Sequence, residues 1–99
     1  MAERKPRLEG KVAIVTGAGS RGAGIGNGKA AAVLLAREGA KVLLVDLFPA
    51  RVNETLDMIV TEGGEASVFT GDVTSNEDCL KIVNTAVERY GKLDILRNL

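Results

Sequence analysis

The chain has 99 residues, of which 45% are hydrophobic and 26% charged, and this composition is typical of one small globular domain spanning residues 1–99. Thirteen Lys and Arg residues balance 13 Asp and Glu residues, so no basic excess is present to attract nucleic acid or an anionic membrane. The absence of His and the single cysteine, Cys79, exclude an internal disulfide, a His/Cys zinc site and His-based acid–base catalysis. No apolar run approaches the ~20 residues of a membrane span and no signal-peptide pattern opens the chain, so we expect a cytoplasmic protein.

Short apolar runs alternate with helical patterns from the start of the chain. Residues 12–16 are apolar, partly β-branched and without alternation, as in a strand that is buried on both faces. Residues 29–38 predict a helix that ends before Gly39, because glycine readily adopts the left-handed conformation after a last helical turn. Residues 41–45 predict a second buried strand that ends at Asp46.

The same alternation continues with a second helix and a third strand. Pro49 suits a first helical turn, and the pair Gly63–Gly64 is expected to end the helix that begins there. The apolar face of this helix is predicted to consist of Val52, Leu56, Ile59 and Val60. Residues 66–70 predict the third strand, which Gly71 and Asp72 close.

Residues 74–77 match the capping box of a third helix, in which the Thr74 side chain would cap the backbone and Glu77 would reach back. The apolar face of this helix is predicted to consist of Cys79, Ile82, Val83, Ala86 and Tyr90. Cys79 is therefore expected to be a small buried hydrophobe. Gly91 ends the helix, and residues 93–96 open a fourth strand, so the order β-α-β-α-β-α-β predicts an α/β fold with a parallel sheet.

Glycine is concentrated between the first strand and the first helix, where residues 17–28 contain six of the 12 glycines. Residues 17–22 read G-x-G-x-x-G after a strand and before a helix, and the free N–H groups of that helix N-terminus favour a phosphate. Asp46 closes the next strand 20 residues beyond Gly26, where a carboxylate would accept hydrogen bonds from a ribose and repel a 2′-phosphate. The alternatives are a surface loop without a ligand and, for Asp46, a helix N-cap.

Several short motifs together resemble the N-terminal part of the short-chain dehydrogenase/reductase family. They are Thr16-Gly17, Gly24-Ile25-Gly26, Asp46, Gly71-Asp72-Val73 and residues 90–96, in the family's order. The resemblance covers residues 8–98 and implies a partial Rossmann fold with a parallel sheet in the order 3-2-1-4. It also implies hydride transfer between a nicotinamide cofactor and a carbonyl or alcohol carbon.

The resemblance implies that the cofactor contacts Gly17, Ser20, Gly24, Ile25, Gly26, Asp46, Asp72, Val73 and Asn98. The turn residues would follow the pyrophosphate, Asp46 would bind the adenosine ribose, and Asp72 with Val73 would contact the adenine. The alternative for Asp72 is a turn residue after a strand. We expect NAD, with NADP as second choice because Arg21 lies in the turn and could neutralise a 2′-phosphate.

The glycines of the turn depart from the family spacing, since the family places them where Arg21 and Ala23 stand, and the turn looks about three residues longer. Either this loop bulges, or Gly22 takes the role of the close-approach glycine.

The family's catalytic pair is a Tyr with a Lys four residues on. The only tyrosine, Tyr90, has Asp94 at that position, and a carboxylate cannot stabilise a phenolate as a Lys does, so Tyr90 is interpreted as the last apolar residue of its helix. We therefore expect no catalytic residue and no metal site in this chain.

Family members are more than twice as long, so we expect a truncated form that carries the cofactor-binding half of an oxidoreductase. The alternative is a catalytically inactive nucleotide-binding or interaction protein. In either case the fourth strand is expected to be an exposed apolar edge that invites homo-association.

Overall fold

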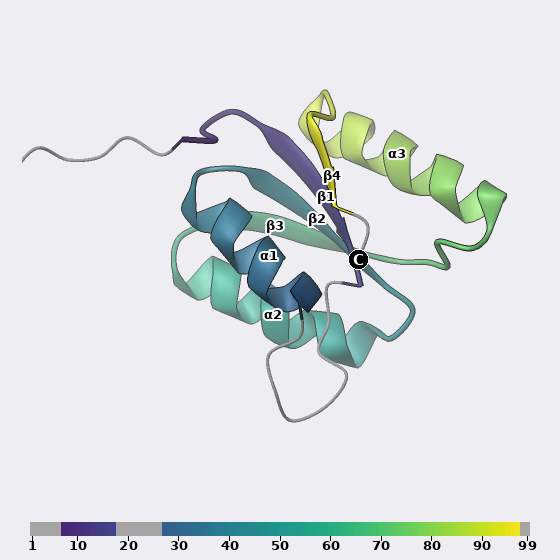
Figure 1. Ribbon diagram of the computed structural model, residues 1–99, viewed down its shortest axis with the longest axis horizontal. Coiled ribbons are helices and arrows are strands. Elements are labelled where there is room, and N and C mark those ends of the chain that lie inside the picture. The colour runs from purple at the N-terminus through teal and green to yellow at the C-terminus, as the bar shows by residue number, and fades with distance from the viewer. Residues whose placement is uncertain (1–6, 18–26, 98–99) are drawn as a thin grey trace, which may run out of the picture.

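The computed structural model describes residues 7–17 and 27–97, in which strands and helices alternate. The elements are β1 (Val12–Thr16), α1 (Asn27–Arg37), β2 (Lys41–Asp46), α2 (Pro49–Thr61), β3 (Glu65–Thr70), α3 (Asn76–Tyr90) and β4 (Ile95–Arg97). The strands form one parallel sheet in the order β3-β2-β1-β4, with α1 and α2 on one face and α3 on the other (Figure 1). The predicted α/β class and the strand order 3-2-1-4 are confirmed.

The two central strands are buried because helices cover both of their faces. All five residues of β1 are buried, as expected for an apolar run without alternation. In β2, Val42 and Leu44 pack in the cluster beneath α1 and α2, whereas Leu43 and Val45 pack against α3. The period of two along the strand thus distributes one apolar run between two cores.

Glycines end the helices at the predicted places. Gly39, Gly63 and Gly91 follow α1, α2 and α3, and all three have positive φ angles. At Gly91 the backbone N–H donates to the carbonyl of Val87 at 2.7 Å, which closes the last turn of α3. The helix α1 begins at Asn27, two residues earlier than the pattern predicted.

The buried face of α2 differs from the predicted one in one residue, because Thr55 is buried where Val60 was expected to be. Val60 was expected to face the core, but it is 56% exposed, and Thr55 is fully buried instead. Thr55 lies three residues after Val52 and four before Ile59, so these three side chains share one face of the helix. The position of Thr55 on the helix, and not the polarity of its side chain, therefore decides that it is buried.

The predicted capping box at the start of α3 is wrong. The N-cap is Ser75, whose hydroxyl accepts the Asp78 N–H at 3.3 Å, while the Thr74 hydroxyl donates to the Asp72 carboxylate at 2.6 Å. Thr74 thus belongs to the turn that Asp72 closes, and the helix begins one residue later than predicted. Glu77 does not reach back but forms an ion pair with Lys81 at 3.4 Å.

Two further residues of α3 lie nearer to the surface than predicted. Cys79 is half-buried, not fully buried, and its thiol donates to the Val73 carbonyl at 3.2 Å. Val83 is partly exposed, so Ile82 and Ala86 carry the buried contact of the helix with the sheet.

The fourth strand begins at Ile95, two residues later than expected. Leu93 packs against the core cluster beneath α3, and Asp94 exchanges two hydrogen bonds with Val12. Its carboxylate accepts the Val12 N–H and its own N–H donates to the Val12 carbonyl, both at 2.9 Å. The side chain of Asp94 thus occupies the donor that a strand carbonyl would use, and Lys92 lies 3.3 Å from the same carboxylate. Within residues 7–17 and 27–97, no helix is both long and apolar enough to cross a membrane.

We expect Leu44→Ala to lower the free energy of unfolding by about 2–5 kcal/mol, because the substitution leaves a cavity in a fully buried strand. The control is Leu34→Ala on α1, where the side chain is 58% exposed and the change is expected to stay within about 0.5 kcal/mol. Urea denaturation followed by circular dichroism measures both. Equal losses in the two variants would contradict the assignment of β2 to the core.

Candidate functional site

A pocket of about 520 Å³ opens at the edge of the sheet where the carboxyl ends of β1, β2 and β3 meet. Its lining residues are Gly17, Val45, Asp46, Leu47, Phe48, Arg51, Gly71, Asp72, Val73 and Thr74. The volume lies within the range of small-molecule sites. This edge is also where open parallel sheets bind their ligands, since the loops after the strands surround it.

The strand register brings the ends of the strands together. Thr16 pairs with Val45, and Asp46 pairs with Thr70, so the three strands finish side by side. The Gly71 N–H then donates to the Asp46 carbonyl at 3.2 Å. A Cβ atom on Gly71 would lie 2.7 Å from the ring of Phe69, so a larger residue at this position would require the ring to move.

Asp46 is the last residue of β2, as predicted, and its carboxylate binds the backbone of the loop that leads to α2. One oxygen accepts the Phe48 N–H at 3.0 Å. The alternative interpretation of Asp46 as the helix N-cap is wrong, because the N-cap is Phe48, whose side chain makes no cap hydrogen bond. Asp46 instead closes a short turn, and the residues that follow it line the pocket.

Asp72 is held in a turn after β3, as its alternative interpretation predicted. Its carboxylate accepts hydrogen bonds from the Thr74 hydroxyl at 2.6 Å and from the Thr74 N–H at 2.9 Å. These two donors, the hydroxyl first, lower the pKa of the Asp72 carboxyl below its usual value. The Asp72 N–H donates to Asp78 at 2.8 Å, which ties the pocket wall to the first turn of α3.

Val73 separates the pocket from a second, smaller hollow. This hollow has a volume of about 110 Å³ and is lined by Ile14, Thr16, Val73, Cys79, Ile82, Val83 and Leu96. Val73 is partly exposed and lines both spaces. An apolar surface therefore continues from the pocket toward α3 and β4.

Of the nine residues predicted to contact a cofactor, the structure brings four into this pocket: Gly17, Asp46, Asp72 and Val73. The other five lie outside the described residues: Ser20, Gly24, Ile25, Gly26 and Asn98.

The helix α1, which follows the glycine-rich turn, is fixed to α2 near its start, because the buried Lys29 forms an ion pair with Glu54 at 2.8 Å.

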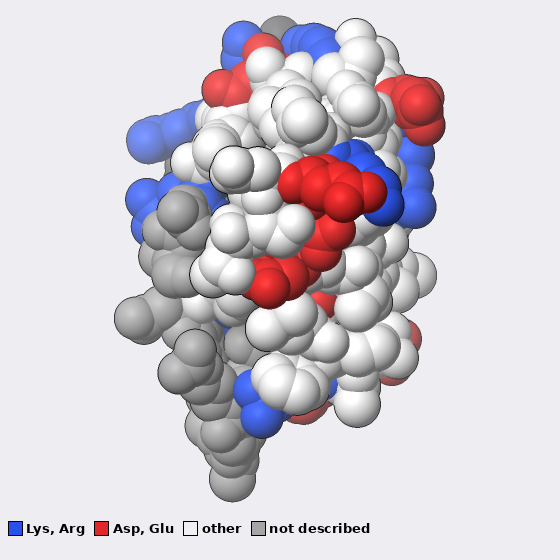
Figure 2. Space-filling view, turned by 90° about the vertical axis from the view of Figure 1, so that its right-hand side faces the viewer, with Lys and Arg blue, Asp and Glu red and all other residues white. Residues whose placement is uncertain are grey.

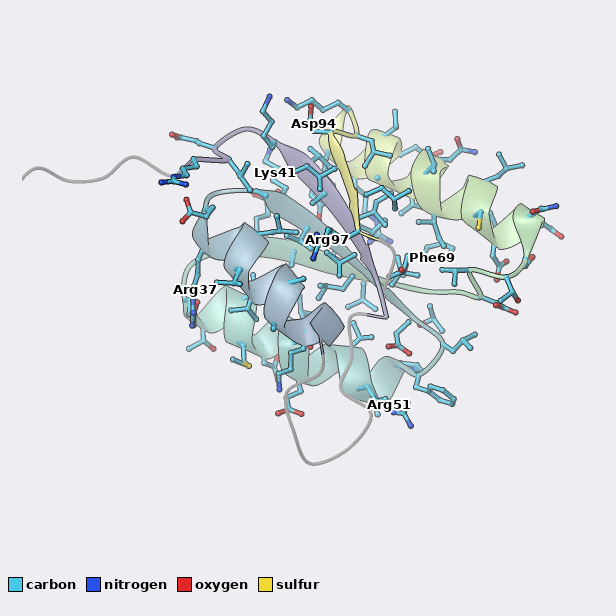
Figure 3. The ribbon with its side chains drawn as sticks, in the orientation of Figure 1. Arg37, Lys41, Arg51, Phe69, Asp94 and Arg97 are labelled. Atoms are coloured by element: carbon cyan, nitrogen blue, oxygen red, sulfur yellow. The ribbon has the colours of Figure 1, made fainter. Side chains whose placement is uncertain are left out.

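Sequence reasoning did not predict the other six described lining residues as ligand contacts: Val45, Leu47, Phe48, Arg51, Gly71 and Thr74. The guanidinium carbon of Arg51 lies 4.4 Å from the centre of the Phe48 ring. Figure 3 shows Arg51 at the end of the sheet that holds the pocket, away from Arg37 and Lys41 at the other end. Their position in the sequence indicated only that residues just after a buried parallel strand lie near its carboxyl end, not that their side chains line the pocket.

Among the residues that the structure describes, the charged groups that line the pocket are two carboxylates and one guanidinium. Asp46 and Asp72 supply the negative charges, and Arg51 supplies the positive one. Seen from the right-hand side of Figure 1, the molecule shows acidic side chains across the middle of this face, with basic side chains beside their upper end and uncharged surface around the rest (Figure 2). Ligand groups that donate hydrogen bonds therefore suit the two carboxylates better than groups that carry negative charge.

The single tyrosine, Tyr90, lies away from the pocket. Tyr90 packs against the core cluster beneath α3, as predicted, and its hydroxyl lies 2.7 Å from the Ser67 hydroxyl of β3. Arg89 donates to the same Ser67 oxygen at 2.9 Å. These three residues fasten the end of α3 to the edge of the sheet, and none of them lines the pocket.

The chain belongs to the short chain dehydrogenase family, whose model matches residues 11–98. An uncharacterized oxidoreductase of Thermotoga maritima is 46% identical over 91 residues, covering 92% of this chain and 34% of that protein. The 7alpha-hydroxysteroid dehydrogenase of Escherichia coli K12 is 38% identical over 92 residues, covering 93% of this chain and 34% of its own length. The resemblance found in the motifs is confirmed.

Solved structures of related dehydrogenases support the same family assignment. The hydroxysteroid dehydrogenase from Escherichia coli superposes with a TM-score of 0.86 at 37% identity, covering 95% of this chain and 38% of that one. The chain thus spans about a third of the length of the curated relatives it matches. Membership of this oxidoreductase family implies a nicotinamide dinucleotide as cofactor.

We expect Thr74→Val to raise the pKa of Asp72 toward its usual value of 3.8, because the variant loses the stronger of two donors. A lowered carboxyl pKa stabilises the fold above the unfolded-state value, and this contribution is lost as the pH falls through the folded-state value. The variant should therefore lose stability at neutral pH and show a weaker acid dependence below pH 3.8. NMR titration of the carboxyl carbon and urea denaturation at several pH values measure both effects.

The matched control is Thr85→Val on α3, where the hydroxyl donates to the Lys81 carbonyl. It should leave the pKa of Asp72 unchanged. An unchanged pKa in Thr74→Val as well would show that the hydroxyl does not stabilise the carboxylate.

Proposed function

We propose that the chain is the cofactor-binding half of a short-chain dehydrogenase/reductase that transfers a hydride between a nicotinamide and a carbonyl or alcohol carbon. In this proposal the pocket holds the adenosine end of NAD. The observation that carries the proposal is that Gly17, Asp46, Asp72 and Val73, predicted from separate motifs, line one pocket. The bound dinucleotide supplies the hydride chemistry, and the residues of this chain bind and orient it.

The lining residues suit an adenosine. Val73 and Leu47 offer apolar surface for a base, and the Asp46 carboxylate lies at the end of β2, where it can accept hydrogen bonds from ribose hydroxyls. Gly17 ends β1 with a positive φ of 63°, which allows the backbone to turn without a side chain beside the ligand.

The charges of the pocket favour NAD over NADP. Asp46 and Asp72 both line it, and a 2′-phosphate beside either carboxylate would be repelled. We further propose that Ser20, Gly24, Ile25 and Gly26 follow the pyrophosphate and that Asn98 completes the site within a single domain of residues 1–99.

A second candidate function is a nucleotide-binding or interaction protein without catalysis. It is supported by the position of Tyr90, whose hydroxyl is engaged with Ser67, and by Asp94, which stands where a catalytic Lys would be and binds the Val12 N–H. The 99 residues therefore contain no Tyr–Lys pair of the kind that the family uses. On this proposal the chain by itself binds cofactor but does not turn over substrate.

We expect Asp46→Asn to weaken NAD⁺ binding about tenfold and to narrow the preference over NADP⁺, because hydrogen bonds to a charged acceptor are lost. The amide oxygen can still accept the Phe48 N–H, so the loop should keep its conformation. Calorimetric titration of the chain with NAD⁺ and NADP⁺ measures both affinities.

The control is Asp57→Asn, which removes the same charge from an exposed position on α2. It should bind NAD⁺ as the unmodified chain does. A chain that is folded by circular dichroism but binds neither dinucleotide would refute the proposed function.

We also propose that two copies of the chain associate through β4. Within the described residues no strand pairs with the outer edge of β4, and Leu96 on this strand is 60% exposed. Unpaired apolar edges are templates for a further strand.

Leu96→Lys is expected to shift the chain toward monomer, because a charge on an edge strand opposes pairing. Analytical ultracentrifugation over a concentration series measures the association. The control is Leu80→Lys, which charges an equally apolar position on α3 that is 68% exposed. Dissociation by Leu80→Lys alone would assign the contact to α3 and not to the strand edge.

A further inference from the structure

The sheet has two outer edges, one at β4 and one at β3, which lies at the opposite end of the strand order. Within the part of the chain that the structure describes, no strand pairs with the outer side of β3. On its inner side, the Gly71 N–H donates to the Asp46 carbonyl of β2. Every second residue of a parallel strand bonds to the same neighbour, so the backbone groups of Ala66, Val68 and Thr70 point outward. Val68 is the middle one of these three, so a strand that added here would bond to it.

The side chain of Arg89 covers the outward carbonyl of Val68. Arg89 lies in the last turn of α3, and its guanidinium donates to this carbonyl at 3.2 Å and to the Ser67 hydroxyl at 2.9 Å. The same Ser67 hydroxyl lies 2.7 Å from the hydroxyl of Tyr90, which packs against the core cluster beneath α3. The guanidinium is therefore held at the edge of the sheet, where it occupies an acceptor that an added strand would need.

Arg89 also brings a positive charge to this edge. None of the ion pairs among the described residues includes Arg89, whereas Arg37 is paired with Glu62 at 2.7 Å. A strand that added to β3 would have to break the hydrogen bond between Arg89 and Val68 and displace the guanidinium. Charged side chains at an edge strand oppose strand addition for this reason.

The two edges of the sheet therefore differ. Arg89 covers the edge at β3, whereas β4 presents Leu96, which is 60% exposed. This difference decides what kind of assembly two open edges would give. Pairing of β4 with β4 uses the same surface on both copies, so it is complete after two chains. Pairing of β4 with β3 of the next copy leaves one edge open at each end, so further copies would add in a row.

We propose that Arg89 limits the association of this chain to a closed two-fold dimer, by blocking the addition of a second copy to β3. The proposal rests on the association through β4 that is proposed above. It assigns to Arg89 a role in selecting the partner edge, which is separate from cofactor binding because Arg89 does not line the pocket.

The test is analytical ultracentrifugation of the full chain over a concentration series. The apparent mass of the unmodified chain should level off at twice the mass of one chain. Arg89→Ala removes both contacts at the edge, and its apparent mass should continue to rise beyond the dimer. Arg89→Lys keeps a charge at the edge and should remain dimeric. Circular dichroism checks the fold, and Arg89→Met, which keeps an unbranched stem, replaces Arg89→Ala if that variant does not fold.

Amide hydrogen exchange at Val68 identifies the contact itself. Its outward N–H should exchange freely in the unmodified dimer and become protected in the Arg89→Ala polymer, because an added strand would accept its hydrogen bond. Adding Leu96→Lys to Arg89→Ala should stop growth beyond dimers, since every step of the row uses a β4 edge. A polymer that leaves Val68 unprotected, or that persists with Leu96→Lys, would show a different contact and overturn the proposal.

The matched control is Lys81→Ala, which removes the same charge from an exposed position on α3 and should remain dimeric. A polymer of Lys81→Ala, or an Arg89→Ala that stays dimeric, would overturn the role of Arg89 and leave the association through β4 intact. Open-ended growth of the unmodified chain would also overturn this role, because β3 would then accept a strand beside Arg89. A folded unmodified chain that stays monomeric would overturn the association itself, and the proposal with it.

Discussion

The parallel, in-register pairing of β1 with β2 is the constraint on which the rest of the structure depends. Both strands are buried by helices on two faces, so their polar backbone groups must be satisfied within the sheet. The register from Val12–Lys41 to Thr16–Val45 ends both strands at one edge. Gly17 and Asp46 come to the same pocket for this reason, and Gly71 joins them through its hydrogen bond to the Asp46 carbonyl.

The buried part of the fold could be predicted from the sequence because its signals are local and strong. Unbroken apolar runs indicate central strands, and glycine after a helical pattern marks the helix end, so β1, β2 and the three helix ends were found. The errors occur where two local rules compete. Thr74 could cap α3 or belong to the turn at Asp72, and in the structure it belongs to that turn while Ser75 caps the helix. At α2, the geometry of the helix face decided for Thr55 against the more hydrophobic Val60.

The candidate site was predictable only in part, for a physical reason. A motif identifies residues by spacing, and Asp46, Asp72 and Val73 were found in this way. Phe48 and Arg51 carry no spacing signal, because their position in the pocket depends on how the loop turns after Asp46. That turn is a tertiary property, and so the positive charge in the pocket could be found only in the folded chain.

The contact between Asp94 and Val12 has a consequence for the order of folding. It joins residues 82 positions apart, while β1, α1 and β2 are neighbours in sequence. Closing so long a loop costs more chain entropy than pairing neighbours, so contacts of this range slow folding. During synthesis, the side of β1 that β4 covers stays open until the ribosome has made residues 95–97. Until then the apolar strand β1 has one unpaired edge in the nascent chain, and a chaperone that covers exposed apolar segments would act in this period.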